Sequence, residues 1–241
     1  MSRIYSSLST FLLILLTLGT LPSCDNRNIT DVIRQMAEAP VDTTGYARRE
    51  LRMGTFSAVQ IDCFADVSLH QIVTGATPRI VLLAPDEVLD NVIAKVTDET
   101  LLLTLQGRYQ MPDDVAVVAH IYAPFLSRIE FNGGKCLRML RFRMACPLEI
   151  HANGLGAIMA DSLESHDLSV ESNGAGSMHF NGINTHTVRF ECNGSGKIVL
   201  SGNCQKGSIA ANGVGMLDVA GLKSSQSMLQ INANGVGSVR K

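Results

Sequence analysis

The sequence predicts an all-β fold, a single-stranded parallel β-helix or β-solenoid with coils of about 20 residues. Two observations carry this prediction. Asn-Gly recurs six times at nearly constant spacing in the C-terminal half, and the residues on both sides of each Asn-Gly alternate between apolar and polar. A fixed period of this length indicates a solenoid, in which each repeat buries its apolar face against the next one.

The Asn-Gly repeat is regular enough to define a corner in each coil. Its asparagines are separated by 21, 20, 20, 19 and 22 residues, and five of the copies read Asn-Gly-x-Gly. Glycine allows close backbone approach and positive φ, while asparagine tolerates the left-handed region and can form a ladder of stacked amides. The predicted corner residues are Asn132, Asn153, Gly154, Gly156, Asn173, Gly174, Gly176, Asn193, Gly194, Gly196, Asn212, Gly213, Gly215, Asn234, Gly235 and Gly237.

The segments that flank each corner predict two strands. Apolar residues stand three and five positions before the asparagine, as Ile150 and Leu148 do, and five and seven positions after it, as Ile198 and Leu200 do. This period of two indicates strands with one buried face. Each repeat is therefore predicted as strand, corner, strand and variable turn, with turns such as residues 162–166 and 202–206.

A chain of antiparallel hairpins is the competing architecture, because Asn-Gly is also the strongest signal for a two-residue hairpin turn. The second glycine after one intervening residue and the near-constant period favour the solenoid. Stacking also lets each short unit place its strands beside those of the next coil, about 4.8 Å away.

Three further segments precede the repeats. Residues 1–23 are predicted as a signal peptide, because Arg3 precedes a short apolar stretch at residues 11–18 and Leu21-Pro22-Ser23 leads to Cys24. Cysteine at this point resembles a bacterial lipobox, which implies an acylated Cys24 and a membrane anchor. An ordinary secreted protein with an incidental Cys24 is the alternative. Residues 24–52, which are polar and aperiodic, are predicted as a lipidated tether.

The folded domain is predicted to span residues 53–241, with regular repeats over 132–241. Residues 53–131 contain few glycines and predict wider, irregular coils that begin the solenoid. The strands expected there cover residues 57–63, 66–73, 79–83, 101–105, 115–122 and 126–131. Residues 86–94 predict a helical turn or two.

Charge and cysteine content exclude several partners. Without residues 1–23 the chain keeps 19 basic residues against 22 acidic ones, a net charge of −3, and it has no tryptophan, which argues against nucleic acid. No CxxC or Cys/His cluster occurs, so no zinc site and no cofactor are predicted. Five cysteines follow Cys24, an odd number that leaves at least one thiol outside any disulfide. They are interpreted as small buried residues, with Cys136–Cys146 and Cys192–Cys204 as candidate bridges; Cys63 is the fifth.

No catalytic or metal centre is predicted. Parallel β-helices that cleave polysaccharides need clustered carboxylates on one face of successive coils. The carboxylates Asp161, Glu164 and Asp167 lie within one predicted turn without an equivalent in neighbouring coils. The remaining candidates are interpreted as surface residues: Glu171 and Glu191 share a register on outward strand positions, His151 and His179 lie at different strand registers, and His166 and His186 fall in turns.

The chain resembles a known family over about residues 54–241. The resemblance rests on the opening Phe56-Ser57-Ala58-Val59, on the segments at residues 66–71 and 96–103, and on the repeated Gly-x-Gly. These features resemble the bacterial lipoproteins with an auto-transporter adhesin "head GIN" domain, which are abundant in Bacteroidetes. The resemblance implies a β-helical fold, a place in the cell envelope, an adhesin-like role and no catalytic residues.

The expected function is a non-catalytic lipoprotein of the cell envelope, anchored in the outer membrane and facing either the surface or the periplasm. Its partners are expected to be the membrane, through the lipid, and a glycan or protein ligand on a solenoid face. The main alternative is a structural envelope protein that self-associates through its exposed strand edges. A glycan-active β-helix enzyme is the third hypothesis.

Overall fold

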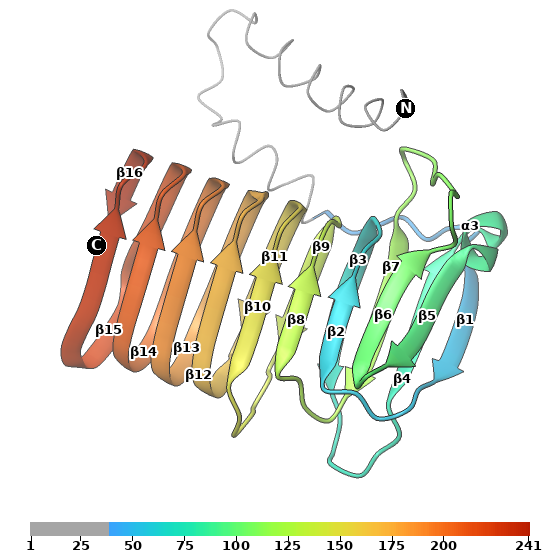
Figure 1. The fold of residues 1–241 in the computed structure, drawn as a ribbon, viewed down its shortest axis with the longest axis horizontal. Helices are drawn as coiled ribbons and strands as arrows, with labels where there is room; N and C mark the ends of the chain where they lie inside the picture. Colours follow the sequence, from blue (N-terminus) through green and yellow to red (C-terminus); the bar gives the residue numbers. More distant parts are fainter. Residues whose placement is uncertain (1–38) are drawn as a thin grey trace, which may run out of the picture.

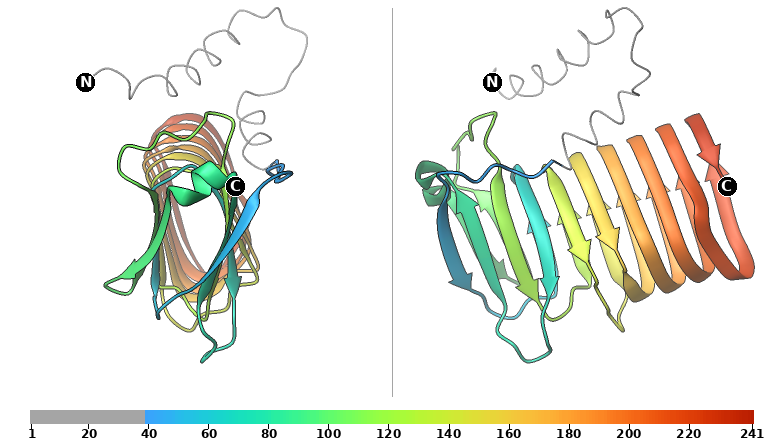
Figure 2. Two further views of the ribbon diagram at one scale, coloured as in Figure 1. Left: turned by 90° about the vertical axis from the view of Figure 1, so that its right-hand side faces the viewer. Right: turned by 180° about the vertical axis from the view of Figure 1, so that it is seen from behind.

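The computed structural model describes residues 39–241, and these form a β-solenoid, so the predicted fold class is confirmed. One sheet of 16 strands winds around a long axis, and the coils lie side by side along it (Figure 1). Seen along the axis, each coil is a flattened loop with strands on its two long walls (Figure 2). The predicted signal peptide, Cys24 and most of the predicted tether lie outside the described residues.

The regular coils pair their strands in parallel, as the solenoid prediction requires. On one wall β10 (Leu148–Ala152) lies between β8 (Arg128–Phe131) and β12 (Glu164–Ser172). On the other wall β11 (Leu155–Asp161) lies between β9 (Cys136–Leu140) and β13 (Ala175–Cys192). The stack continues through β14 (Ser195–Ala211), β15 (Val214–Ala233) and β16 (Val236–Arg240). This parallel register excludes the hairpin alternative for the repeats.

The variable turns differ from their prediction. β13, β14 and β15 each run without a break from one corner to the next, through the residues expected to form separate turns. A short break at Ser162 and Leu163 separates β11 from β12. The reason is that the turn backbone of each coil pairs with the same turn of its neighbour, as Asn184 does with Asn203. Hydrogen bonding between coils therefore overrides the local turn propensity.

The corners depend on backbone contact between successive coils. A Cβ added to Gly174 would lie 1.9 Å from the carbonyl oxygen of Gly154, and one added to Gly194 would lie 1.6 Å from that of Gly174. Real Cβ atoms do not approach so closely, so only glycine fits. The second glycine also holds a positive φ, which is +149° at Gly196.

An asparagine ladder runs along the outside of these corners. Each corner asparagine donates a hydrogen bond from Nδ2 to Oδ1 of the preceding one, with donor–acceptor distances of 2.9–3.2 Å along the series Asn234, Asn212, Asn193, Asn173, Asn153 and Asn132. At its N-terminal end Asn132 donates to the carboxylate of Asp62 at 2.8 Å, and Gln60 donates to the same carboxylate at 2.7 Å. A carboxylate only accepts hydrogen bonds, so it terminates a chain of donors that all point toward it.

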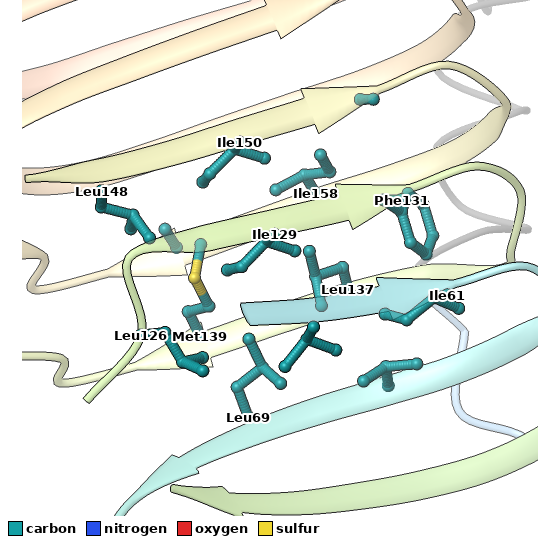
Figure 3. Close-up of a cluster of buried hydrophobic side chains, with 14 of the residues drawn as sticks. Ile61, Leu69, Leu126, Ile129, Phe131, Leu137, Met139, Leu148, Ile150 and Ile158 are labelled. Carbon is teal, nitrogen blue, oxygen red and sulfur yellow. The ribbon is translucent and has the colours of Figure 1, made fainter. Parts of the chain in front are cut away.

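The hydrophobic core fills the space between the two walls. Ile129 and Ile150 on one wall, and Leu137 and Ile158 on the other, are at most 2% exposed (Figure 3). Burying a side chain of this size contributes about 1.5–3 kcal/mol. Within β13 the rings of Phe180 and Phe190 meet edge to face, with centroids 5.1 Å apart. The core is thus one continuous row of apolar side chains along the solenoid axis.

The N-terminal part joins the solenoid through β2 and β3. β2 (Ala58–Ile61) pairs in parallel with β8 and with β6 (Thr100–Leu105), and β3 (Ala65–Gln71) pairs in parallel with β9 and with β7 (Val117–Ala123). Beyond them the pairing becomes antiparallel, between β7 and β4 (Arg79–Ala84), β4 and β1 (Ala47–Arg52), and β6 and β5 (Val92–Thr97). The six strands expected over residues 57–131 are present with slightly shifted bounds.

The helical turn expected within residues 86–94 is present as α3 (Asp86–Asp90), and it ends before residue 94 because β5 begins at Val92 and pairs with β6 along its whole length. The bounds of the tether are wrong. The strand β1 lies inside the segment predicted as tether, because all six of its residues pair with β4 and Arg49 donates to the carbonyl of Leu89 at 2.7 Å. No helix among the described residues is long and apolar enough to cross a membrane.

The five cysteines of the described residues form no disulfide, so neither candidate bridge exists. Cys192 lies directly before the corner at Asn193, whereas Cys204 pairs with Thr185 in the turn at the other end of the coil. Burial raises the pKa of the Cys63 and Cys192 thiols to about 12. Cys146, in contrast, is partly exposed.

We predict that replacing a corner glycine destabilises the solenoid far more than a neighbouring change. Gly194→Ala should lower the free energy of unfolding by about 3 kcal/mol, because the new Cβ overlaps the preceding coil's backbone. Ser195→Ala, at the next and exposed position, should change it by less than about 0.5 kcal/mol. Urea denaturation followed by circular dichroism measures both, and equal shifts would contradict the corner packing.

We also predict that the cysteines react in order of burial. In the Cys24→Ala variant at pH 8, iodoacetamide should label Cys146 first and spare Cys63 and Cys192 until denaturant is added, because only the thiolate reacts. Mass spectrometry of tryptic peptides reports the order. Rapid labelling of Cys192 in the folded protein would refute the burial described above.

Candidate functional site

Two of the carboxylates considered for catalysis, Glu164 and Asp167, bind different partners. Glu164 binds Arg143, with Oε2 and Nε 3.1 Å apart, and Asp167 Oδ2 lies 2.8 Å from His166 Nδ1. Hydrogen bonds from Thr187 and His166 lower the pKa of Asp167. Among residues 39–241 no three His, Cys, Asp or Glu side chains gather in a way that could hold a metal ion.

Glu171 and Glu191, which lie two residues before their corner asparagines, occupy the same register on adjacent coils, as predicted. These two residues are directly paired on β12 and β13, and His151 lies one coil earlier, opposite Glu171. His151 Nδ1 lies 3.4 Å from Glu171 Oε2, and Glu191 pairs with Arg189 at 3.2 Å. Each carboxylate thus has a cationic or hydrogen-bonding partner on the wall itself.

A groove at the turn side of the solenoid gathers side chains from successive coils. We name it the turn groove; its volume is about 500 Å³, within the range of about 300–1,000 Å³ that ligand sites occupy. One side carries Glu164, Asn184 and Asn203, which lie in register on adjacent coils. The other side carries His166, His186 and Gln205, and between the two sides lie Ser165, Thr185 and Cys204.

The two sides of the turn groove offer different chemistry. The imidazole rings of His166 and His186 stack with centroids 5.4 Å apart and planes 15° apart. The opposite side offers a carboxylate and two amides, which donate and accept hydrogen bonds. Between them, Thr185 Oγ1 is buried and has no hydrogen-bond partner in the described part of the protein. Because neighbouring coils lie about 4.8 Å apart, the polar side chains of each row follow one another along the axis at about that spacing.

A second void lies inside the corners and has a different character. Its volume is about 160 Å³, and corner glycines and small residues such as Ala152, Ser172, Cys192 and Ala211 line it. No charged side chain reaches it. We attribute this void to the small side chains that line it, which fill less of the space between the walls than the leucines and isoleucines of the core.

Sequence reasoning placed His166 and His186 in turns and missed their alignment. A signal was available, since each lies seven residues before its corner asparagine, Asn173 and Asn193. Equal distance from a repeated landmark predicts the same register on adjacent coils. The interpretation of Glu171 and Glu191 used this rule, and the turn histidines obey it too.

Comparison with known proteins gives one family and several similar folds. A family model described as "Putative auto-transporter adhesin, head GIN domain" matches residues 55–240. No curated protein matches the chain. The solved structure of a "putative adhesin" from Bacteroides fragilis is similar with a TM-score of 0.58 and 19% identity, covering 81% of this chain and 96% of that one.

Two structures from Parabacteroides distasonis are also similar in fold. One, described as a "putative adhesin", has a TM-score of 0.59 and 14% identity, and the match covers 80% of this chain and 81% of that one. The other, described as a "putative lipid binding protein", has a TM-score of 0.58 and 12% identity, with 82% and 96% covered. These likenesses establish a shared solenoid architecture.

Proposed function

Because this chain belongs to the "putative auto-transporter adhesin, head GIN domain" family, we propose that it is a non-catalytic, adhesin-like binding module of the cell envelope. The turn groove is its ligand site. The observation that carries this assignment is a pair of in-register rows of polar side chains across neighbouring coils, one with the stacked imidazoles of His166 and His186 and the other with a carboxylate and two amides. Such a groove fits an extended polar ligand that lies along the solenoid axis.

A glycan suits this groove better than a protein partner. Amides and carboxylates such as Asn184 and Glu164 bind hydroxyl groups, and flat imidazoles such as His186 can cover a sugar ring. Protein interfaces instead concentrate their affinity in buried Trp, Tyr and Arg anchors. The residues that line the turn groove include none of these three types.

Lipidation at Cys24 would hold the module at the outer membrane. Fourteen residues separate Cys24 from Ala39, whose carbonyl accepts a hydrogen bond from Lys135 of the solenoid, and a fully extended chain of that length spans at most about 50 Å. The module can therefore stand clear of the bilayer and still turn its groove toward a ligand. A structural role without a ligand remains the competing function, and the two experiments below separate them.

We predict that removing the stacked imidazoles weakens glycan binding. The double variant His166→Ala/His186→Ala should bind at least about tenfold more weakly, which corresponds to about 1.4 kcal/mol. His151→Ala, at a half-buried histidine outside the groove, is the matched control and should bind as the wild type does. Biolayer interferometry of the mature protein against immobilised envelope and mucin glycans measures the difference. If no glycan in the panel is bound, or if both variants lose binding equally, the turn groove is not the site.

We further predict that Cys24 decides membrane attachment. The wild type should sediment with outer membranes, whereas Cys24→Ala should be soluble after export, because several acyl chains anchor firmly. Protease treatment of intact cells then reports the face. Cleavage from whole cells agrees with an adhesin-like role, and protection until the outer membrane is opened would favour the structural role.

A further inference from the structure

A cluster of basic and aromatic side chains lies on the N-terminal strands β1, β4, β7 and β3, and none of its residues lines the turn groove. The pairing of β1, β4, β7 and β3 places Arg52, Arg79, Tyr122 and His70 in one row across the four strands. These strands lie next to one another at the N-terminal end of the stack (Figure 1). We name these residues, together with His120, the cap cluster.

The cap cluster is held by stacking. The Arg79 guanidinium carbon lies 4.0 Å from the centre of the Tyr122 ring, and the His70 ring stacks on Tyr122 with centroids 4.6 Å apart and planes 16° apart. His70 Nε2 lies 3.1 Å from His120 Nδ1, within hydrogen-bonding distance. Tyr122 therefore lies between a cation and an imidazole, and one hydrogen bond joins the two imidazoles.

Arginines outnumber carboxylates in and around the cap cluster. Arg52 and Arg79 are directly opposite on β1 and β4, an arrangement of like charges that is destabilising on a sheet. Glu50 lies 3.5 Å from Arg79 and is shared with Arg48 at 2.6 Å. Asp66 on β3 binds Arg138 on β9. The titratable and charged groups on the strands paired with β3 are His120 and Tyr122 on β7 and Arg138 on β9, with Asp66 on β3 itself. Arg79 on β4 lies beyond Tyr122, and Arg48, Glu50 and Arg52 on β1 lie one strand further away.

An excess of cations beside a hydrogen-bonded pair of imidazoles is a suitable environment for an oxyanion. Guanidinium groups bind phosphate through paired hydrogen bonds. Burial, followed by the neighbouring His120 and Arg79, lowers the pKa of His70 below its ordinary value of 6.5. A bound anion would oppose these causes and favour the protonated imidazole.

We propose that the cap cluster binds a phosphate group, with Arg52 and Arg79 as its fixed cations and the His70–His120 pair as a proton-dependent donor. The phosphate group is carried either by a lipid headgroup or by a soluble molecule. Because a bound anion favours the protonated imidazole of His70, affinity rises as pH falls. The site is separate from the turn groove, so it does not depend on glycan binding there.

The test uses the Cys24→Ala mature chain, whose lack of a lipid keeps membrane insertion out of the measurement. Binding of inorganic phosphate is followed by NMR of the imidazole resonances at pH 5.5 and pH 7.5. Sedimentation with vesicles of phosphatidylglycerol, compared with vesicles of phosphatidylcholine, is measured at the same two pH values. Saturable phosphate binding at the cap cluster together with equal sedimentation in both vesicles supports a soluble source, and sedimentation with phosphatidylglycerol alone supports a headgroup.

Three variants separate the site from general surface charge. Arg52→Gln/Arg79→Gln should reduce binding at least about tenfold. His70→Gln should keep the binding seen at pH 7.5 but lose the increase of about tenfold expected at pH 5.5. Arg189→Gln, an exposed arginine on a regular coil, should bind as the parent does. The proposal is overturned if neither probe binds at pH 5.5, if binding is independent of pH, or if Arg189→Gln loses as much as the double variant.

Discussion

The contact between corner backbones of successive coils is the constraint on which the rest of the structure depends. At Gly174, Gly194 and Gly213 the position of a Cβ would lie 1.5–1.9 Å from a carbonyl oxygen of the preceding coil. The chain can stack at the spacing of a parallel sheet only if these positions carry no side chain. The asparagine beside each glycine then meets its counterpart at hydrogen-bond distance, and the apolar residues on both walls meet in a continuous core.

Stacking in register also produces the functional surface. Because every coil has the same path, residues at equal distance from the corner form rows along the axis. Where such a row consists of polar residues, several hydrogen-bonding or charged side chains lie close together. His166 and His186 form one such row, and Asn184 and Asn203 form another on the other side of the turn groove. The corner side of the coil is fixed by packing, so sequence variation suited to recognition is confined to the turn side and the outward walls. This division explains why a repetitive scaffold can carry a non-repetitive binding site.

The sequence predicted those features of the fold that depend on the local repeat. The Asn-Gly-x-Gly period determines the solenoid, its coil length and the parallel stacking of the repeats, and the period-two alternation determines which residues enter the core. The sequence pattern could not predict β1 or β5. Arg52 and Val96 become strand residues only through antiparallel pairing with β4 and β6, respectively. The same long-range pairing assembles the cap cluster, whose members His70, Arg79 and Tyr122 share no motif. The segments between the strands were predicted as separate variable turns because their strand propensity is weak, yet the neighbouring coil supplies hydrogen bonds that extend the strands through them.

Native-state hydrogen exchange at the corners tests the central claim most directly. The amides of Ala175 and Ser195 donate to the carbonyls of Gly154 and Gly174, each at 3.1 Å. If coil-to-coil contact at the corners holds the solenoid together, these amides should exchange only on global unfolding, as slowly as amides in the middle of β13. Exchange as fast as in the exposed loop at residues 112–114 would contradict the account, since the corners would then be loose connections between independently paired strands.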